Sequence, residues 1–325
     1  MPALTTGQLD FFSENGYLAI DGVLDPESVI DPIVKEYAAV LDRLADWLLS
    51  EGKITSTYSE LPFGERVTRI YEESGEVYNQ FFDFSLPQNG ITPDTPFWAG
   101  PAVFRAMTDP NLLDVAESIV GPEVYSNPVQ HVRIKVPESR APRDENGAVK
   151  FGVTPWHQDN GVVTEAADAT DMLTVWFPLM DTDVSNGCLQ VVPRSHRGDL
   201  LTHCPGYHGA AGLQIPENLF DAPAATPVPL RKGGVLLLTK KTVHSSLPNV
   251  SERIRWSFDL RYQPVGQPTG REVFPGFVAR SRTNPAVELH DAQAWHDMWQ
   301  HARDTLAKGE QPKFNRWDSE HPVCA

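Results

Sequence analysis

Hydrophobic side chains recur at helical spacing near the start of the chain. The recurring positions are Ile33, Tyr37, Leu41, Leu44 and Leu48. This period predicts an amphipathic helix. Asp25-Pro26 and Asp31-Pro32 each resemble a helix cap followed by proline at the first helical position, and Gly52 is suited to end the helix. We expect residues 1–125 to be mainly helical, with a further short helix between Asp109-Pro110 and Gly121.

After about residue 125 the pattern changes to short β-forming runs separated by turns. These runs are VQHVRIKV, MLTVWFPLM, GCLQVVP, GGVLLLT and RIRWSFDLRY. Short strands in this arrangement predict a sandwich or barrel. Helical spacing returns after Asp291, which can cap, in a stripe of Trp295, Met298, Trp299, Ala302 and Leu306. We expect one domain over residues 1–325: a helical wrap over 1–125, a β-core over 126–265, and an extension with a helix over 266–325.

Three longer segments interrupt this order. Residues 81–98 are aromatic and rich in proline, which indicates a loop that is either a packed surface segment or a wall of the substrate site. Residues 137–151 and 203–227 are candidate lids. His203 and His208 in the second lid are candidate substrate contacts, whereas His196 is interpreted as structural.

Composition narrows the class of protein. The chain has 325 residues, 41% hydrophobic and 22% charged, and a formal net charge of −16. Such an acidic chain disfavours non-specific contact with nucleic acid or anionic membrane. The sequence contains no run of about 18 apolar residues, so we expect no membrane span. The three cysteines lack CxxC spacing, so we expect free thiols in a reducing, cytoplasmic compartment. No basic and apolar leader is seen, and we infer no obligate protein partner.

The stretch TPWHQDNGV contains the first candidate chemistry. His157 and Asp159 lie two residues apart, and in a strand such residues point to one face. His244, at the end of the apolar run GGVLLLT, can supply a third ligand. Two histidines and one carboxylate form the facial triad of non-haem Fe(II) oxygenases, which leaves coordination positions open for a cosubstrate and O2.

In the predicted strand after His244, apolar residues alternate with polar and charged residues. Ile254, Trp256, Phe258, Leu260 and Tyr262 share one face, whereas Arg253, Arg255, Ser257, Asp259 and Arg261 share the other. A buried arginine needs an anion, and Arg255 is therefore predicted to hold the distal carboxylate of 2-oxoglutarate. By the same alternation Trp176 can wall this pocket, and His131, Arg133 and Lys135 form a cationic face suited to an anionic cosubstrate.

These motifs together resemble the phytanoyl-CoA dioxygenase family of Fe(II)/2-oxoglutarate oxygenases. The resemblance rests on PWHQD, SNGCLQVVPRSH, VHSSLPNVSERIRWSFDLRY and the 11-residue gap from His244 to Arg255, and it covers roughly residues 121–265. It implies a mainly β fold with flanking helices: a double-stranded β-helix, a cupin-like jelly roll, wrapped by N- and C-terminal α-helices. It also implies Fe(II), 2-oxoglutarate and O2 as cofactor and cosubstrates, with ascorbate in a supporting role.

The resemblance assigns roles by position. His157, Asp159 and His244 would bind iron. Arg255 and Ser246 would bind the far carboxylate of 2-oxoglutarate, Trp176 would pack beside it, and Lys135 matches a polar cosubstrate contact. Because Asp159 is present, halogenation is not implied, and we expect hydroxylation or a related oxidation of a small molecule.

Two alternatives remain open on the sequence. A jelly-roll protein could bind a ligand without reacting, or the same three ligands could hold catalytic zinc for hydrolysis. The substrate is expected to be a free, partly apolar metabolite rather than an acyl-CoA or a nucleic acid, because residues 81–98 and 203–227 contain no lysine or arginine.

Overall fold

The computed structural model describes residues 4–205, 213–316, 318 and 320–324. The helices are α1 (Thr6–Asn15), α2 (Asp31–Ser50), α3 (Phe63–Ser74), α4 (Pro101–Met107), α5 (Pro110–Val120) and α6 (Ala292–Leu306). The strands of the main sheet are β1 (Tyr17–Ile20), β2 (Glu123–Lys135), β3 (Leu173–Pro178), β8 (Val235–Thr239), β10 (Arg255–Pro264) and β11 (Phe277–Ser281). The remaining strands are β4 (Leu189–Val191), β5 (Cys204–Pro205), β6 (Leu213–Gln214), β7 (Thr226–Val228) and β9 (His244–Ser246).

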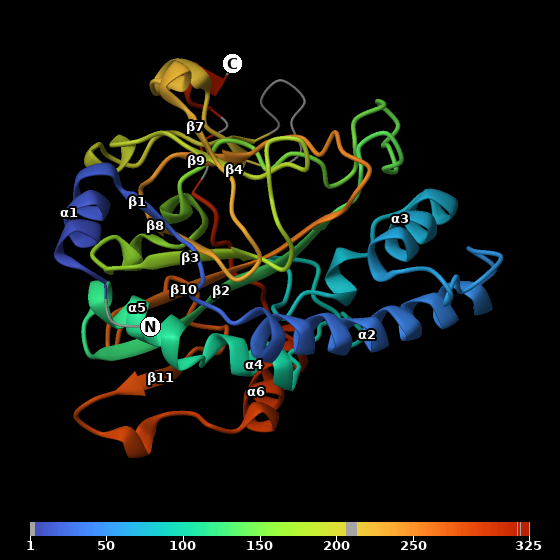
Figure 1. The fold of residues 1–325 in the computed structure, drawn as a ribbon, viewed down its shortest axis with the longest axis horizontal. Helices are drawn as coiled ribbons and strands as arrows, with labels where there is room; N and C mark the ends of the chain where they lie inside the picture. The colour runs from blue at the N-terminus through green and yellow to red at the C-terminus, as the bar shows by residue number, and fades with distance from the viewer. Residues whose placement is uncertain (1–3, 206–212, 317, 319, 325) are drawn as a thin grey trace.

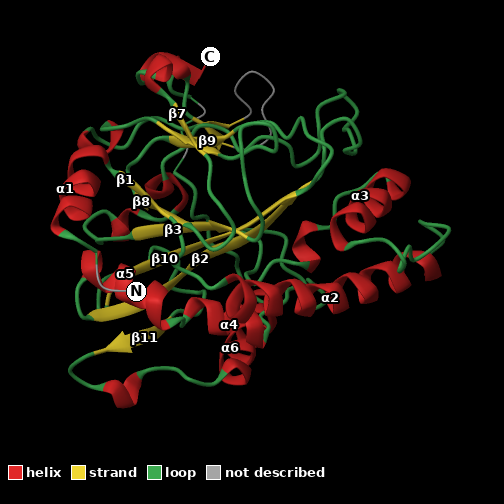
Figure 2. Ribbon diagram, viewed as in Figure 1, coloured by secondary structure: helices red, strands yellow, loops and turns green. Residues whose placement is uncertain are grey.

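Two antiparallel sheets form the core. The larger sheet has six strands in the order β1-β8-β3-β10-β2-β11, and the smaller has three in the order β7-β4-β9. Figure 1 shows the smaller sheet above one face of the larger, while α2, α4 and α6 lie below the other face. This arrangement is the predicted mainly β core with flanking helices, and Figure 2 shows how the helices stay outside the sheets.

The main sheet draws on all three predicted parts of the chain. β1 comes from the N-terminal part and pairs with β8, with Tyr17 opposite Leu238. β11 comes from the C-terminal extension and pairs with β2, with Phe277 opposite Ser126. The N-terminal periodicity did not predict β1, because four residues are too few to establish a strand pattern.

The helices cover the apolar face of β10. Tyr37 of α2 contacts Trp256 and Phe258, with ring centroids 5.4 and 5.8 Å apart respectively. Four of the five residues of the predicted α6 stripe are buried, namely Trp295, Trp299, Ala302 and Leu306, whereas Met298 is only partly buried. Burying one face of the strand in this way directs its polar face between the two sheets.

Of the four helix starts that the sequence predicted, one is wrong. Asp109 caps α5 by accepting two backbone N–H groups, and Asp291 caps α6 by accepting one. Asp25 caps a π-helical turn, Pro26–Ile30, which continues directly into α2. Asp31 is therefore not a cap, because the preceding turn already supplies helical backbone before it.

The cysteine prediction was also wrong. Cys204 and Cys324 form a disulfide with a Cα–Cα distance of 5.3 Å, and only Cys188 is free, buried in the protein. The paired cysteines lie 120 residues apart in sequence, so their spacing carried no signal. The argument for a reducing compartment from three free thiols therefore does not stand. Among the helices the structure describes, none combines the length and apolar character needed to cross a membrane.

Candidate iron and 2-oxoglutarate site

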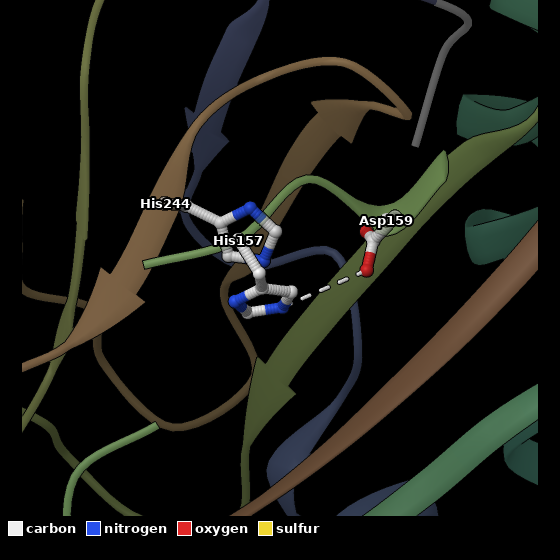
Figure 3. Close-up of side chains that lie close together, drawn as sticks. All are labelled: His157, Asp159 and His244. Carbon is white, nitrogen blue, oxygen red and sulfur yellow. Dashed lines mark ion pairs between the residues drawn. The ribbon is translucent and has the colours of Figure 1, made fainter. Parts of the chain in front are cut away.

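The three predicted iron ligands converge between the two sheets. His157 forms an isolated antiparallel bridge with His244, the first residue of β9, through two backbone hydrogen bonds of 3.0 Å. Asp159 begins a short 3-10 turn two residues further on. One ligand atom from each residue lies within 4.8 Å of the others. Figure 3 shows the three side chains gathered around one small space. The chemistry of this donor set suits one divalent iron ion.

Both imidazoles are held in the form that a metal requires. Nδ1 of His157 lies 2.8 Å from the Pro155 carbonyl oxygen, and Nδ1 of His244 lies 2.9 Å from that of Thr242. A carbonyl only accepts, so each Nδ1 carries the proton and each Nε2 keeps a free lone pair. Burial, and next the neighbouring His244, lowers the pKa of His157 to about 3, so this ring is neutral near pH 7.

Asp159 is fixed through both of its oxygens. Its Oδ1 accepts a hydrogen bond from Nη2 of Arg261 at 2.5 Å, and its Oδ2 accepts one from the Thr174 hydroxyl at 2.5 Å. Its side chain is 0% exposed. Burial alone would raise the pKa of Asp159, but Arg261 and the two histidines outweigh burial and lower it. The carboxylate is therefore charged and positioned without the metal.

Arg255 lies in the same cavity without a carboxylate partner. Its Nε donates to the Gly187 carbonyl oxygen at 3.2 Å and its Nη1 donates to the Ser257 hydroxyl at 2.7 Å. The residue is 0% exposed, and its Nη2 has no hydrogen-bond partner among the described residues. Burial, and next the charge of Arg133, lowers the pKa of Arg255 to about 9. A buried guanidinium with a free donor is suited to bind an anion.

Gly187 is required at the position that contacts Arg255. Its φ is 84°, and a Cβ there would lie 2.8 Å from the Leu247 carbonyl oxygen. Only glycine adopts this backbone conformation without strain and also admits so close an approach. The SNG turn of the sequence motif thus brings a carbonyl to the buried arginine.

The other predicted cosubstrate residues divide into two groups. Trp176 lines the cavity with Arg255, whose Cζ lies 5.8 Å from the ring centroid. Lys135 donates to the hydroxyls of Ser246 and Thr154 at 2.7 and 2.8 Å, at the edge of the adjoining cleft. His131 differs, because its Nδ1 contacts Asp83 at 2.9 Å and Ser85 at 3.1 Å, and it is absent from the cavity lining.

A cleft of about 780 Å³ lies beside the iron cavity. Both candidate lids contribute walls to it: residues 137–151 supply Val149 and Phe151, and residues 203–227 supply Gln214 and Glu217. Arg133 and Thr154 line both the cleft and the cavity. The cleft therefore offers a route to the three iron ligands.

The segment 81–98 packs against the protein instead of forming a wall of this cleft. Phe82, Phe84 and Leu86 are fully buried in the main hydrophobic core. Phe84 contacts Phe258 of β10 at 5.1 Å between ring centroids. Of the two interpretations left open by the sequence, the packed segment is the one the structure favours.

His203 positions the ligand loop. Its Nε2 accepts the Gln158 backbone N–H at 3.0 Å and its Nδ1 donates to the Leu201 carbonyl oxygen at 2.9 Å. With both ring nitrogens engaged and only 1% of the residue exposed, His203 supports the loop that carries the ligands. His208, the other candidate of that loop, lies outside the described residues. Gln158 also supports the loop, since its side chain bonds Lys241 and Leu201.

Sequence reasoning missed the residues that hold Asp159. The sequence pattern placed Arg261 on the polar face of its strand without a partner, and it did not single out Thr174. Both lie on the polar faces that strand alternation identified, so the signal was present. What the pattern could not give is register: Arg261 pairs with Thr174 across β10 and β3, which directs both toward Asp159.

Comparison with known proteins identifies the class. The family model for phytanoyl-CoA dioxygenase matches residues 12–257. A 1-deoxypentalenic acid 11-beta-hydroxylase of Streptomyces arenae is 30% identical over 268 residues, covering 80% of this chain and 81% of that protein. Peroxisomal phytanoyl-CoA dioxygenase of Homo sapiens is 24% identical over 263 residues, covering 80% of this chain and 68% of that protein.

A solved structure shares the fold. The non-heme monooxygenase ThoJ, in its apo form, has a TM-score of 0.55 and 17% sequence identity, and the match covers 92% of this chain and 96% of that chain. The chain belongs to the phytanoyl-CoA dioxygenase family, and its core is the jelly roll of the 2-oxoglutarate oxygenases. It is a non-haem iron dioxygenase that uses 2-oxoglutarate and O2 and acts on a small molecule.

Proposed function

We propose that the enzyme hydroxylates an unactivated carbon of a free small molecule, with His157, Asp159 and His244 as the iron ligands. The observation that carries this proposal is the convergence of the three ligand atoms within 4.8 Å, beside a fully buried arginine that has no carboxylate partner. The zinc-hydrolase alternative accounts for the three ligands but gives no use for Arg255. A non-catalytic binder could use Arg255 for an anionic ligand but gives no use for the three converging metal ligands.

Arg255 is proposed to bind the far carboxylate of 2-oxoglutarate through Nη2, with Ser246 contributing its hydroxyl and Trp176 packing beside the carbon chain. Lys135 is proposed to keep Ser246 in place, since its Nζ donates to that hydroxyl. Burial, and next the charges of Arg255 and Arg133, lowers the pKa of Lys135 well below its usual value. His131 is not retained in this set, because Asp83 and Ser85 hold its Nδ1.

When bound, Fe(II) supplies the redox step, in which O2 converts 2-oxoglutarate to succinate and CO2, placing one oxygen atom in succinate and the other in a substrate C–H bond. The chain's own residues prepare this step. Pro155 and Thr242 fix the two imidazole tautomers, and Arg261 and Thr174 keep the Asp159 carboxylate charged. The buried cavity excludes bulk water from the reacting atoms.

The proposed substrate is free and not a coenzyme A thioester. The described cleft lining has three basic residues, and Lys150 is already paired with Glu76 at 2.8 Å while Lys135 is occupied by two hydroxyls. A coenzyme A phosphate and pyrophosphate would need several free cations or helix N-termini. The hydroxylase from Streptomyces arenae, by its name, acts on a free acid, which supports the same class here.

The test is a coupled assay on the iron-loaded enzyme. Matched free acids, their coenzyme A thioesters and uncharged metabolites are each incubated with 2-oxoglutarate and O2, and succinate and oxidised product are measured together. We expect free compounds to give equal amounts of succinate and hydroxylated product, and Zn(II) in place of iron to give neither. Turnover of thioesters alone would refute the substrate class, and substrate hydrolysis with Zn(II) would refute the oxygenase.

A further inference from the structure

Arg133 stands at the junction of the cleft and the iron cavity, and it is among the residues that line both. Its Nε donates to Oδ2 of Asp259 at 3.1 Å. Neither of its two Nη atoms donates a hydrogen bond to another described residue, and its side chain is 27% exposed. The open end of the guanidinium fork therefore faces the space through which a ligand would reach the iron ligands.

The charges around this junction are unequal. Arg261 donates hydrogen bonds to Oδ1 of both Asp159 and Asp259, so these two carboxylates balance the charge of Arg261. Arg133 shares Asp259 with Arg261, and Arg255 hydrogen-bonds a carbonyl and a hydroxyl but no carboxylate. Bound Fe(II) and the 2-oxoglutarate dianion would cancel each other's charge. The loaded site would still hold at least one more positive charge than negative.

Arg255 and Arg133 are separate anion sites. Arg255 is 0% exposed and lies deep in the cavity beside Trp176, as expected for a cosubstrate that binds before the substrate. Arg133 opens to the cleft, where a later ligand would enter. One surplus cation at the inner end of the cleft matches one anionic group on that ligand.

The outer cleft has a different character. Phe151, Val153, Trp156 and Leu247 give it apolar walls. Of the three acids in the described lining, two are engaged within the protein: Glu217 accepts from Trp156 Nε1 at 3.2 Å, and Asp144 accepts two backbone N–H groups at 2.9 Å, while the third is Glu138. A ligand that fits both ends has an apolar body in the outer cleft and a single anionic group at its inner end.

We propose that Arg133 binds the carboxylate of the substrate, and that the substrate is therefore an apolar monocarboxylic acid. This inference rests on the proposed function and deepens it. The carboxylate would accept from the two Nη donors of Arg133, while Nε stays on Asp259 and fixes the plane of the guanidinium. Anchored there, the apolar body of the acid lies along Phe151, Val153 and Trp156 of the cleft, and a carbon close to the anchored end is the one presented to iron.

The test compares acids with their uncharged amides. The probes are apolar monocarboxylic acids with straight-chain, branched and fused-ring carbon skeletons, each paired with its primary amide. Binding to the unreactive Zn(II)·2-oxoglutarate complex is measured by ligand-detected NMR titration, and kcat/KM is measured on the iron enzyme for every pair that turns over. In the wild-type protein we expect acids to be favoured by roughly 10- to 100-fold, the size of a charge-assisted contact.

Arg133→Gln should reduce this ratio to roughly threefold or less, and Arg133→Lys should restore part of it, because lysine keeps the charge and loses the fork. The control is Arg253→Gln, which removes the same charge at the exposed surface, where Arg253 pairs with Asp183. That control should keep the acid preference of the wild-type protein.

Three outcomes would overturn the assignment: amides that bind as well as acids, an acid preference that survives in Arg133→Gln, or no acid that binds at millimolar concentration. Failure of the proposed function looks different. In that case the iron-loaded wild-type protein would not bind 2-oxoglutarate or form succinate with any compound, whatever residue occupies position 133.

Discussion

Two buried arginines lie at opposite ends of the polar face of β10, and they differ in whether a carboxylate balances their charge. Arg261 has carboxylates on two sides, with Asp159 at 2.5 Å and Asp259 at 3.0 Å. Arg255, six residues earlier on the same face, has only a carbonyl and a hydroxyl as partners. Both side chains are almost completely inaccessible to solvent.

This difference indicates that Arg261 has a structural role, whereas Arg255 is available to bind an anionic ligand. A buried cation with two counterions is internally satisfied, so Arg261 serves to position Asp159. A buried cation with neutral partners and a free Nη2 is satisfied only when an anion arrives. Four predictions test this division, beginning with the largest expected effect.

Removing the imidazole of His244 should abolish catalysis while leaving Arg255 and Arg261 in place. In His244→Ala the backbone bridge to His157 can persist, because it uses only main-chain atoms. We expect iron content and succinate formation to fall to background, with an unchanged circular dichroism spectrum. The control is His290→Ala, whose side chain is 75% exposed. Full turnover in His244→Ala would remove this residue from the metal site.

The two arginines should differ sharply in their effect on stability. Arg261→Met leaves Asp159 and Asp259 buried without their common partner, which should cost about 3–5 kcal/mol of unfolding free energy. Arg255→Met removes a cation that has no counterion, so the expected change is within about 1 kcal/mol in either direction. Urea unfolding of the metal-free proteins measures both. Equal destabilisation by the two substitutions would show that the ends of β10 do not differ.

The cosubstrate prediction applies to the Arg255 end alone. Arg255→Leu should weaken 2-oxoglutarate binding by roughly 10- to 150-fold, because a charge-assisted bidentate contact is lost. Iron should remain bound, since no iron ligand contacts this side chain. Isothermal titration with 2-oxoglutarate under anaerobic conditions gives the affinity, and elemental analysis gives the iron. Arg253→Leu serves as the matched control on the exposed side chain two residues earlier.

The sequence alone predicted the two faces of β10 and the three candidate iron ligands. Alternation along β10 correctly separated Trp256 and Phe258, which pack on the helices, from Arg255 and Arg261, which point between the sheets. The spacing of His157, Asp159 and His244 predicted ligands that the fold brings together. These features follow from local geometry, because the period of a strand fixes its faces.

Features that depend on distant pairing were not predicted. The role of Arg261 in holding Asp159 depends on the register of β10 against β3, which places Thr174 opposite Arg261. His131 shares its strand face with Arg133 and Lys135, yet Asp83, from a segment 48 residues away in sequence, holds it. The disulfide between Cys204 and Cys324 is non-local in the same sense. Side-chain partners of this kind emerge only from the tertiary arrangement.

The smallest predicted effects come from the hydroxyls that serve each end. Thr174→Val removes the donor to Oδ2 of Asp159, and Ser257→Ala removes the acceptor of Arg255 Nη1. Because each change deletes one hydrogen bond, each should alter affinity by about 2- to 10-fold, corresponding to about 0.5–1.5 kcal/mol. The division of β10 predicts which affinity changes: Thr174→Val should weaken metal binding and Ser257→Ala should weaken 2-oxoglutarate binding. Titrating both variants with Co(II) and then with 2-oxoglutarate separates the two effects. If both substitutions weakened the same ligand, the two ends would act as one site, and the assignment of Arg261 to Asp159 and of Arg255 to the cosubstrate would have to be abandoned.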